Sequence, residues 1–199
     1  MRRLLLAVPS VLPLLLAAPL AQAAPDSAYT KLHAEDTCKV TAEPAEDEGG
    51  DWSELLCTGY GDYPVYLSYA DARESMFYGF PPGDKPTSWE SFNGFNGVSG
   101  TIEWRLDKGV PFATILRWSI ATDVPEKNIE VLVVSKVAQP DDHDGCVVGY
   151  VVAPGNPGHN VQAREIADDH ARGFACWRDE PVVRAGSVPL PTPARYKRE

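Results

Sequence analysis

The sequence predicts a mostly β domain of the α+β type, in which an antiparallel meander sheet packs against one C-terminal helix and two disulfides staple the chain. Three observations support this prediction. Apolar and polar residues alternate in several short stretches, which is the period of a half-buried strand. One later segment has its apolar residues at helical spacing instead. Four cysteines follow a leader typical of exported proteins, in which disulfides form and persist.

Residues 1–23 have the features of a Sec-type signal peptide. Two arginines precede an apolar run that ends at Leu20, and small residues at positions 21 and 23 indicate cleavage after Ala23. Three prolines interrupt the run, which is shorter than the roughly 20 apolar residues that cross a bilayer. We therefore expect a periplasmic or secreted protein with no membrane span after signal cleavage.

Charge limits the partners of the mature chain. Cleavage removes two arginines and leaves 16 basic and 28 acidic side chains, a net charge of −12. Residues 184–199 carry +3, so residues 24–183 carry −15. Binding to phosphates requires clustered Lys and Arg, so this composition argues against nucleic acid as a partner. An acidic surface also attracts cationic partners, although solubility alone explains it.

The four cysteines predict two disulfides, because an exported chain with an even number of cysteines usually pairs them. No C-x-x-C occurs, so neither a redox dithiol nor a tight zinc site is indicated, and we expect no metal or cofactor. Of the three possible connectivities, the spacing favours Cys38–Cys57 with Cys146–Cys176. Short strands on both sides of the acidic, Gly-containing turn would bring the first two sulfurs together. The second bridge would staple the helix to the sheet.

The strands are expected in a definite order along residues 24–183, which we interpret as a single domain. Short strands are predicted at residues 29–32, 38–41, 53–58 and 65–69, followed by a long ordered loop rich in Gly, Pro, Asn and Ser at 79–100. A meander then follows, because short connections pair neighbouring strands antiparallel. Its four strands are predicted at residues 101–106, 112–120, 129–137 and 146–153. Arg117 is the one charged interruption of the second of them.

The helix is predicted to begin after Asn160, a suitable N-cap, and to end near Gly173. Its apolar stripe consists of Ala163, Ile166, Ala167, His170, Ala171 and Phe174. His170 is therefore expected to be partly buried. The Pro-rich, basic segment 184–199 has few large apolar side chains and is predicted to be disordered.

No established catalytic motif occurs: the chain lacks G-x-S-x-G, H-E-x-x-H, a phosphate-binding P-loop and G-x-G-x-x-G. His143 stands among aspartates, but their spacing does not match a calcium loop, and an exposed polar turn explains it better. His33 and His159 have no recognisable partners in the sequence. We therefore assign no catalytic residue, and a non-catalytic role is favoured over an enzyme.

Aromatic density is the most informative remaining feature, with ten of the nineteen aromatic residues between Tyr60 and Phe95. On loops they can form a recognition patch, because aromatic rings provide contact area at low entropic cost. Alternatively they cover the open side of the sheet as a second core layer, and this interpretation is favoured. The candidate binding residues are Tyr60, Tyr63, Phe77, Tyr78, Trp89, Phe92, Phe95, Ser99 and Trp104.

Several segments resemble a group of small exported proteins of alphaproteobacteria, a resemblance that implies no activity. The segments are residues 52–60, 64–66, 89–96, 102–105, 145–149 and 163–167, and the resemblance spans roughly residues 29–183. The chain is also similar, over a few residues, to periplasmic inhibitors of c-type lysozyme, which insert a Ser-Gly loop with a nearby aromatic into the enzyme's cleft. That similarity would assign Ser99, Gly100 and Trp104 to this role.

These observations predict an exported envelope or periplasmic protein that binds an unidentified protein, glycan or cationic ligand without catalysing a reaction. One alternative is a small secreted hydrolase whose active site has no sequence motif. The other is a protein similar to the lysozyme inhibitors.

Overall fold

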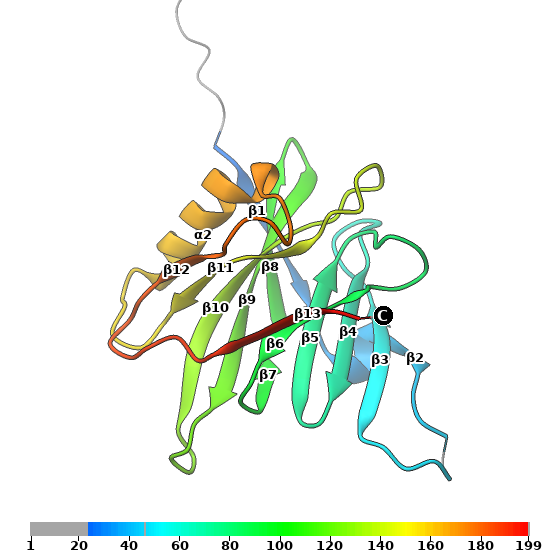
Figure 1. Ribbon diagram of the computed structural model, residues 1–199. Coiled ribbons are helices and arrows are strands. Elements are labelled where there is room, and N and C mark those ends of the chain that lie inside the picture. Colours follow the sequence, from blue (N-terminus) through cyan, green and yellow to red (C-terminus); the bar gives the residue numbers. More distant parts are fainter. Residues whose placement is uncertain (1–23, 46, 199) are drawn as a thin grey trace, which may run out of the picture.

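A computed structural model describes residues 24–45 and 47–198 (Figure 1). The predicted signal peptide lies outside the described residues. The largest sheet has the strand order β1-β8-β9-β10-β11-β12, with β7 also paired to β9. Its strands are β1 (Asp26–Lys31), β7 (Asn96–Val98), β8 (Thr101–Asp107), β9 (Val110–Ala121), β10 (Asn128–Lys136), β11 (Cys146–Val152) and β12 (Val182–Arg184).

Two smaller sheets complete the β structure. The first has the order β2-β3-β4-β5 and consists of β2 (Cys38–Ala42), β3 (Trp52–Cys57), β4 (Val65–Ala70) and β5 (Arg73–Tyr78). The second pairs β6 (Ser88–Phe92) with β13 (Pro193–Lys197). The helical elements are α1 (Ala34–Thr37), α2 (His159–His170) and a 3-10 turn, η1 (Ala171–Gly173). The mostly β fold class is thus confirmed.

The predicted meander is confirmed, because β8, β9, β10 and β11 are neighbours and each pair is antiparallel. Alternation along the strands divides their side chains between two faces. In β8, Ile102 and Trp104 point toward the four-stranded sheet, whereas Glu103 and Arg105 make their polar contacts on the side of α2. Each face of the large sheet therefore has its own packing partner.

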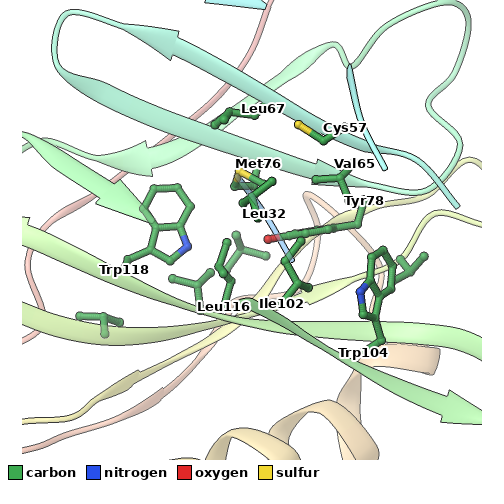
Figure 2. Packing of buried hydrophobic residues seen from close by; sticks show 14 of the residues in the cluster. Leu32, Cys57, Val65, Leu67, Met76, Tyr78, Ile102, Trp104, Leu116 and Trp118 are labelled. Carbon is green, nitrogen blue, oxygen red and sulfur yellow. The ribbon is translucent and has the colours of Figure 1, made fainter. Parts of the chain in front are cut away.

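Two hydrophobic clusters fill the spaces on either side of the large sheet. Between the two larger sheets, Trp104, Leu116 and Trp118 pack with Val65 and Tyr78 (Figure 2). On the opposite face, α2 buries a stripe against β9, β10 and β11. The central residues of this second cluster are Ile115, Val134, Val148, Ala163 and Ile166. The described chain is thus layered as small sheet, large sheet and helix.

Both predicted disulfides are present. Cys38 and Cys57 are cross-strand partners on β2 and β3, and their sulfurs are bonded. Cys146 at the start of β11 is bonded to Cys176, which follows α2 and η1. No helix within the described residues has the length and apolar character needed to cross a membrane.

The segment predicted to be a loop at residues 79–100 contains two strands, so that prediction was wrong for β6 and β7. Gly and Pro near β6 marked it as irregular, yet its own residues from Trp89 to Phe92 are buried. β6 is recognised only by its distant partner β13, and β7 only by pairing with the C-terminal end of β9. Short strands paired at long sequence distance leave little local signal.

The C-terminal segment is ordered, which corrects the prediction of a disordered tail at residues 184–199. β13 runs beside β6 and antiparallel to it (Figure 1). Leu190 packs against the core between the sheets. Prolines and few large apolar residues predict poor core formation. Here a buried carboxylate, Glu90, binds Arg195 and holds the segment instead.

The ends of α2 also differ from the prediction. The N-cap is Gly158 rather than Asn160, and its carbonyl accepts a hydrogen bond from Gln162. His170 is exposed rather than partly buried, because α2 ends there and the chain continues as η1. Ala171 and Phe174 keep their predicted burial.

Candidate functional site

Two hollows lie near opposite ends of α2. The first, here named the hairpin hollow, has a volume of about 400 Å³ and is bounded by the β8–β9 turn, the end of β10 and Arg172 just after α2. The second, named the Arg117 hollow, has a volume of about 210 Å³ and reaches Asn160 at the start of α2. Ligand sites are typically concave and of roughly 300 Å³ or more, so the hairpin hollow is the stronger candidate by size.

The surface inside the hairpin hollow is largely apolar. Val110, Phe112 and Val137 are its apolar lining residues. Val110 leaves 49% of its surface exposed, whereas Phe112 and Val137 are buried at 7% and 1% exposure. The guanidinium of Arg172 lies 3.7 Å from the centre of the Phe112 ring, a cation–π contact that covers one side of the ring. Val110 is therefore the lining residue that offers accessible apolar surface to a ligand.

The charges around the hairpin hollow are largely paired with one another. Arg172 lies 3.6 Å from Asp107, and the Lys136 ammonium lies 3.8 Å from Asp142 and 2.8 Å from Asp144. Lys136 also donates to the carbonyl of Phe174 at 3.2 Å. Because these groups satisfy each other, they frame the apolar surface without giving it a strong net charge.

The Arg117 hollow is more polar. Arg117 projects from the middle of β9 and its Nη2 lies 3.1 Å from Nε2 of His159. Ser99 and Thr101 line the same hollow, with Ile115 and Leu132 as its apolar wall. The predicted binding residue Ser99 is therefore placed beside Arg117, a residue that the sequence marked only as an interruption of an apolar strand.

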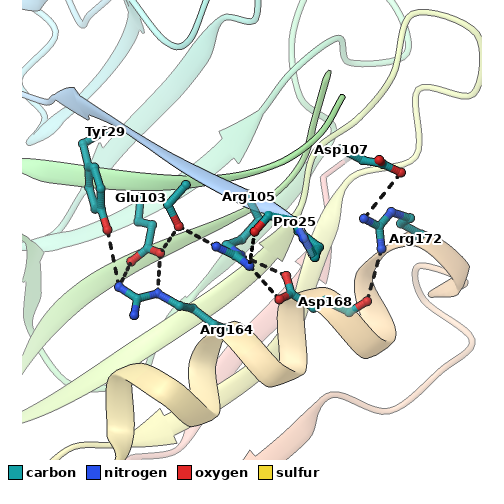
Figure 3. Close-up of polar contacts among 9 residues, drawn as sticks. Pro25, Tyr29, Glu103, Arg105, Asp107, Arg164, Asp168 and Arg172 are labelled. Atoms are coloured by element: carbon teal, nitrogen blue, oxygen red, sulfur yellow. Dashed lines mark hydrogen bonds and ion pairs between the residues drawn. The ribbon is translucent and has the colours of Figure 1, made fainter. Parts of the chain in front are cut away.

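An ion-pair network lies between α2 and the large sheet (Figure 3). Glu103 at one end of it lines the Arg117 hollow, and Asp107 and Arg172 at the other end line the hairpin hollow. Arg164 of α2 donates to both oxygens of Glu103, from Nε at 2.6 Å and from Nη2 at 3.1 Å. Arg105 is bound by both oxygens of Asp168, at 2.9 and 2.6 Å, and also donates to the carbonyl of Pro25. Ser27 of β1 donates to Glu103 and accepts from Arg105, so β1, β8 and α2 are joined on one face of the sheet.

The pKa shifts of Glu103 and Arg164 favour the charged form of each. Burial alone raises the pKa of Glu103, but hydrogen bonds from Arg164 and Ser27 and the charges of Arg164 and Arg105 lower it below its ordinary value. The hydrogen bond from Glu103 raises the pKa of Arg164. Because Arg164 donates to both oxygens of Glu103, this ion pair has a more defined geometry and is stronger than a pair with a single contact.

Replacing Glu103 with Gln is expected to lower the free energy of unfolding at pH 7 by about 1 kcal/mol, because Arg164 keeps considerable exposure to water. A carboxylate whose folded pKa is lowered stabilises the protein above its unfolded pKa, and this contribution is lost as the pH falls through the folded pKa. The difference between wild type and Glu103→Gln should therefore shrink below pH 4.5. Urea unfolding at pH 7 and pH 3.5 measures it. A difference that is unchanged at the lower pH would contradict this electrostatic account.

Most of the aromatic candidates lie in the core. Phe77, Tyr78, Trp89, Phe92 and Trp104 are buried. Tyr60 and Tyr63 are partly buried, and Phe95 is the one candidate aromatic with a large exposed fraction, 59%. Tyr60 and Tyr78 pack on Trp104, whose ring centre lies 6.3 Å from that of Tyr60 and 5.9 Å from that of Tyr78. This arrangement agrees with the second core layer and leaves no continuous aromatic patch among these residues.

The residues suggested by lysozyme inhibitors do not form an exposed wedge. Trp104 is completely buried, and its indole nitrogen donates to Thr30 at 2.8 Å. Ser99 is half-buried, and its amide donates to the carbonyl of Arg117. An aromatic that enters an enzyme cleft requires exposed surface, which Trp104 lacks in this fold.

The histidines occupy separate places. His143 lies in an exposed turn, as predicted, with Nδ1 3.2 Å from the carbonyl of Phe80. His159 has partners that the sequence did not reveal, because Arg117 lies 42 positions away along the chain. Within residues 24–45 and 47–198, no group of three or more His, Cys, Asp or Glu side chains is arranged to hold a metal ion.

Comparison with known proteins adds no assignment to this geometry. The chain matches no family model, no curated protein and no solved structure.

Proposed function

We propose that this chain is an exported, non-catalytic binding protein that holds a small apolar ligand in the hairpin hollow. The observation that carries the proposal is the largely apolar lining of a hollow of about 400 Å³, in which Val110 is exposed beside the buried Phe112 and Val137. The two disulfides support export, because such bonds persist in oxidising compartments.

The chemistry of the lining favours binding over catalysis. Nucleophilic catalysis needs a Ser, Thr, Cys or similar group within hydrogen-bond reach of a base. The hairpin hollow is lined by Asp, Lys, Arg and Gln beside its apolar residues, and none of these forms such a pair. Arg172 and Asp107 instead occupy each other, as do Lys136 and Asp142.

The paired rim also narrows the ligand class. A protein or glycan partner would need an extended surface, and a cationic ligand would need unpaired carboxylates. An uncharged apolar molecule of moderate size needs neither, since it gains free energy from burial of its surface. The amide of Gln139, which already donates to the carbonyls of Pro111 and Val137, keeps the rim rigid.

Val110→Asp is expected to weaken binding of the neutral fluorescent probe N-phenyl-1-naphthylamine by about five- to tenfold, because a carboxylate replaces apolar contact area. A fluorescence titration of the mature protein measures the dissociation constant. Wild type should show saturable binding at one site.

Val124→Asp is the matched control. Val124 is exposed to the same degree, 50% against 49%, but lies in the turn beyond the other end of β9. It should leave probe binding unchanged. Equal effects of the two substitutions, or no saturable binding by wild type, would refute the hairpin hollow as the ligand site.

A further inference from the structure

We infer that the Arg117 hollow is a second binding site, which takes the carboxylate of a small organic acid with a short apolar body. The site is independent of the hairpin hollow, since it lies at the other end of α2 and shares no lining residue with it. Three features carry the inference: an arginine without a carboxylate partner, a neutral support for that arginine, and a wall of mixed polar and apolar groups.

Arg117 is partly buried, yet no carboxylate within the described residues lies within 4.0 Å of its guanidinium. Every other arginine in residues 24–45 and 47–198 either forms an ion pair or is exposed. This is notable in a chain with many more acids than bases, where a carboxylate partner is easy to provide. Desolvating a charge without a counter-charge is costly, and a bound anion removes that cost.

His159 orients Arg117 without neutralising it. Its Nδ1 lies 2.6 Å from the carbonyl of Asn156, so this nitrogen carries the proton and Nε2 accepts from Arg117 at 3.1 Å. An imidazole that accepts a hydrogen bond brings no negative charge. The guanidinium is therefore held in place by one Nη while its other donors keep their capacity for a planar, two-oxygen ligand.

The surrounding charges favour an anion. The ammonium of Lys31 lies 3.2 Å from Oγ1 of Thr101, which lines the hollow, and Lys31 forms no ion pair among the described residues. Glu103 also lines the hollow, but its two oxygens are already bound by Arg164 and Ser27. Two cations thus approach the hollow with one carboxylate that is occupied elsewhere.

The remaining wall selects an organic acid over a bare inorganic anion. Hydroxyls of Ser99 and Thr101 can donate to a carboxylate, whereas Ile115, Leu132 and the ring of Tyr29 offer apolar contact. A hollow of about 210 Å³ has room for a carboxylate and a body of a few carbons. Phosphate would fill the polar part and leave the apolar wall without a partner.

The test is an NMR titration of the ¹⁵N-labelled mature protein at pH 7 with isobutyrate, its neutral isostere isobutyramide, and inorganic phosphate. Isobutyrate should give saturable shifts at the amides of Ser99 and Thr101 and at the side-chain Nε–H of Arg117. Isobutyramide and phosphate should bind at least about tenfold more weakly, since a charge-assisted hydrogen bond or the apolar contact is lost.

Arg117→Gln should weaken isobutyrate binding by at least about tenfold, and Arg117→Lys, which keeps the charge, should weaken it less. Arg172→Gln, which removes an arginine at the other hollow, should leave it unchanged. The dispersion of the amide spectrum shows whether each variant is folded. Equal shifts with isobutyrate and isobutyramide, or unchanged binding by folded Arg117→Gln, would overturn the site. Phosphate binding as tight as that of isobutyrate would overturn the assignment of an organic acid.

Discussion

Arg195→Met should lower the free energy of unfolding at pH 7.5 by about 3–5 kcal/mol, the usual cost of leaving one charge of a buried ion pair unpaired. The Glu90 side chain is 2% exposed, and its Oε1 lies 2.7 Å from Nε of Arg195. Its Oε2 accepts from the amide of Val147 at 2.8 Å. Without Arg195 this backbone amide would be the remaining partner of a charge in the core.

The pH dependence of this loss distinguishes electrostatics from packing. Burial raises the pKa of Glu90, and the charge and hydrogen bond of Arg195 oppose that rise. In the variant the pKa of Glu90 rises further, so the folded state binds a proton more readily than the unfolded state does. Stability then falls as the pH rises above the ordinary carboxyl value of 4.5. The deficit should therefore be largest at neutral pH and shrink toward pH 4.5.

Urea unfolding at pH 7.5 and pH 4.5 measures the loss in the free energy of unfolding and its dependence on pH. Arg184→Met is the matched control, because Arg184 is exposed on β12 and forms no ion pair among the described residues. It should change stability by less than about 0.5 kcal/mol. Adding Glu90→Gln to Arg195→Met should recover part of the loss, since an uncharged amide costs less to bury. A deficit independent of pH, with no recovery in the double variant, would show that Arg195 acts through packing.

Replacing Cys146 and Cys176 together with Ala should cost about 3–4 kcal/mol of stability, because the bond closes a 30-residue separation that restricts the unfolded chain. This bridge joins β11 to the segment after α2 and thereby keeps the helix on the sheet. Ala163 and Ile166 pack with Val148 in the cluster between α2 and the sheet, so this packing requires α2 to stay on the sheet. Urea unfolding under oxidising conditions gives the loss directly.

The paired substitution of Cys38 and Cys57 is the comparison. Its separation of 19 residues gives a similar entropic term, but β2 is an edge strand whose side chains are mostly exposed. Without the bond β2 can detach locally and regain freedom, so the global loss should be smaller. Hydrogen exchange should speed up in β2 in this variant and in α2 in the other. Equal global losses with no local difference in exchange would contradict this division.

Local patterns were sufficient wherever the determining interaction is between neighbours in the chain. Alternation predicted β8 and β10, and the short turns beside them predicted β9 and β11 as their antiparallel neighbours, because connections of a few residues favour that pairing. Spacing around an acidic turn predicted Cys38–Cys57, and the other bridge followed. The second core layer favoured for the aromatics up to residue 95 holds for Tyr78 and Phe92, which pack between the sheets, whereas Phe95 is exposed.

The sequence by itself therefore determined the class of fold, the meander and the two disulfides, because periodicity and turn residues can be recognised within short stretches of the chain. Only the tertiary structure decided what holds the C-terminal segment and where the hollows lie. Glu90 meets Arg195 across 105 positions, and Arg117 meets His159 across 42. The effect of a buried charge depends on the partners that folding brings beside it, and the local sequence does not identify partners that are distant along the chain. For that reason a segment with the composition of a disordered tail became a strand, and an interruption of β9 became a candidate anion site.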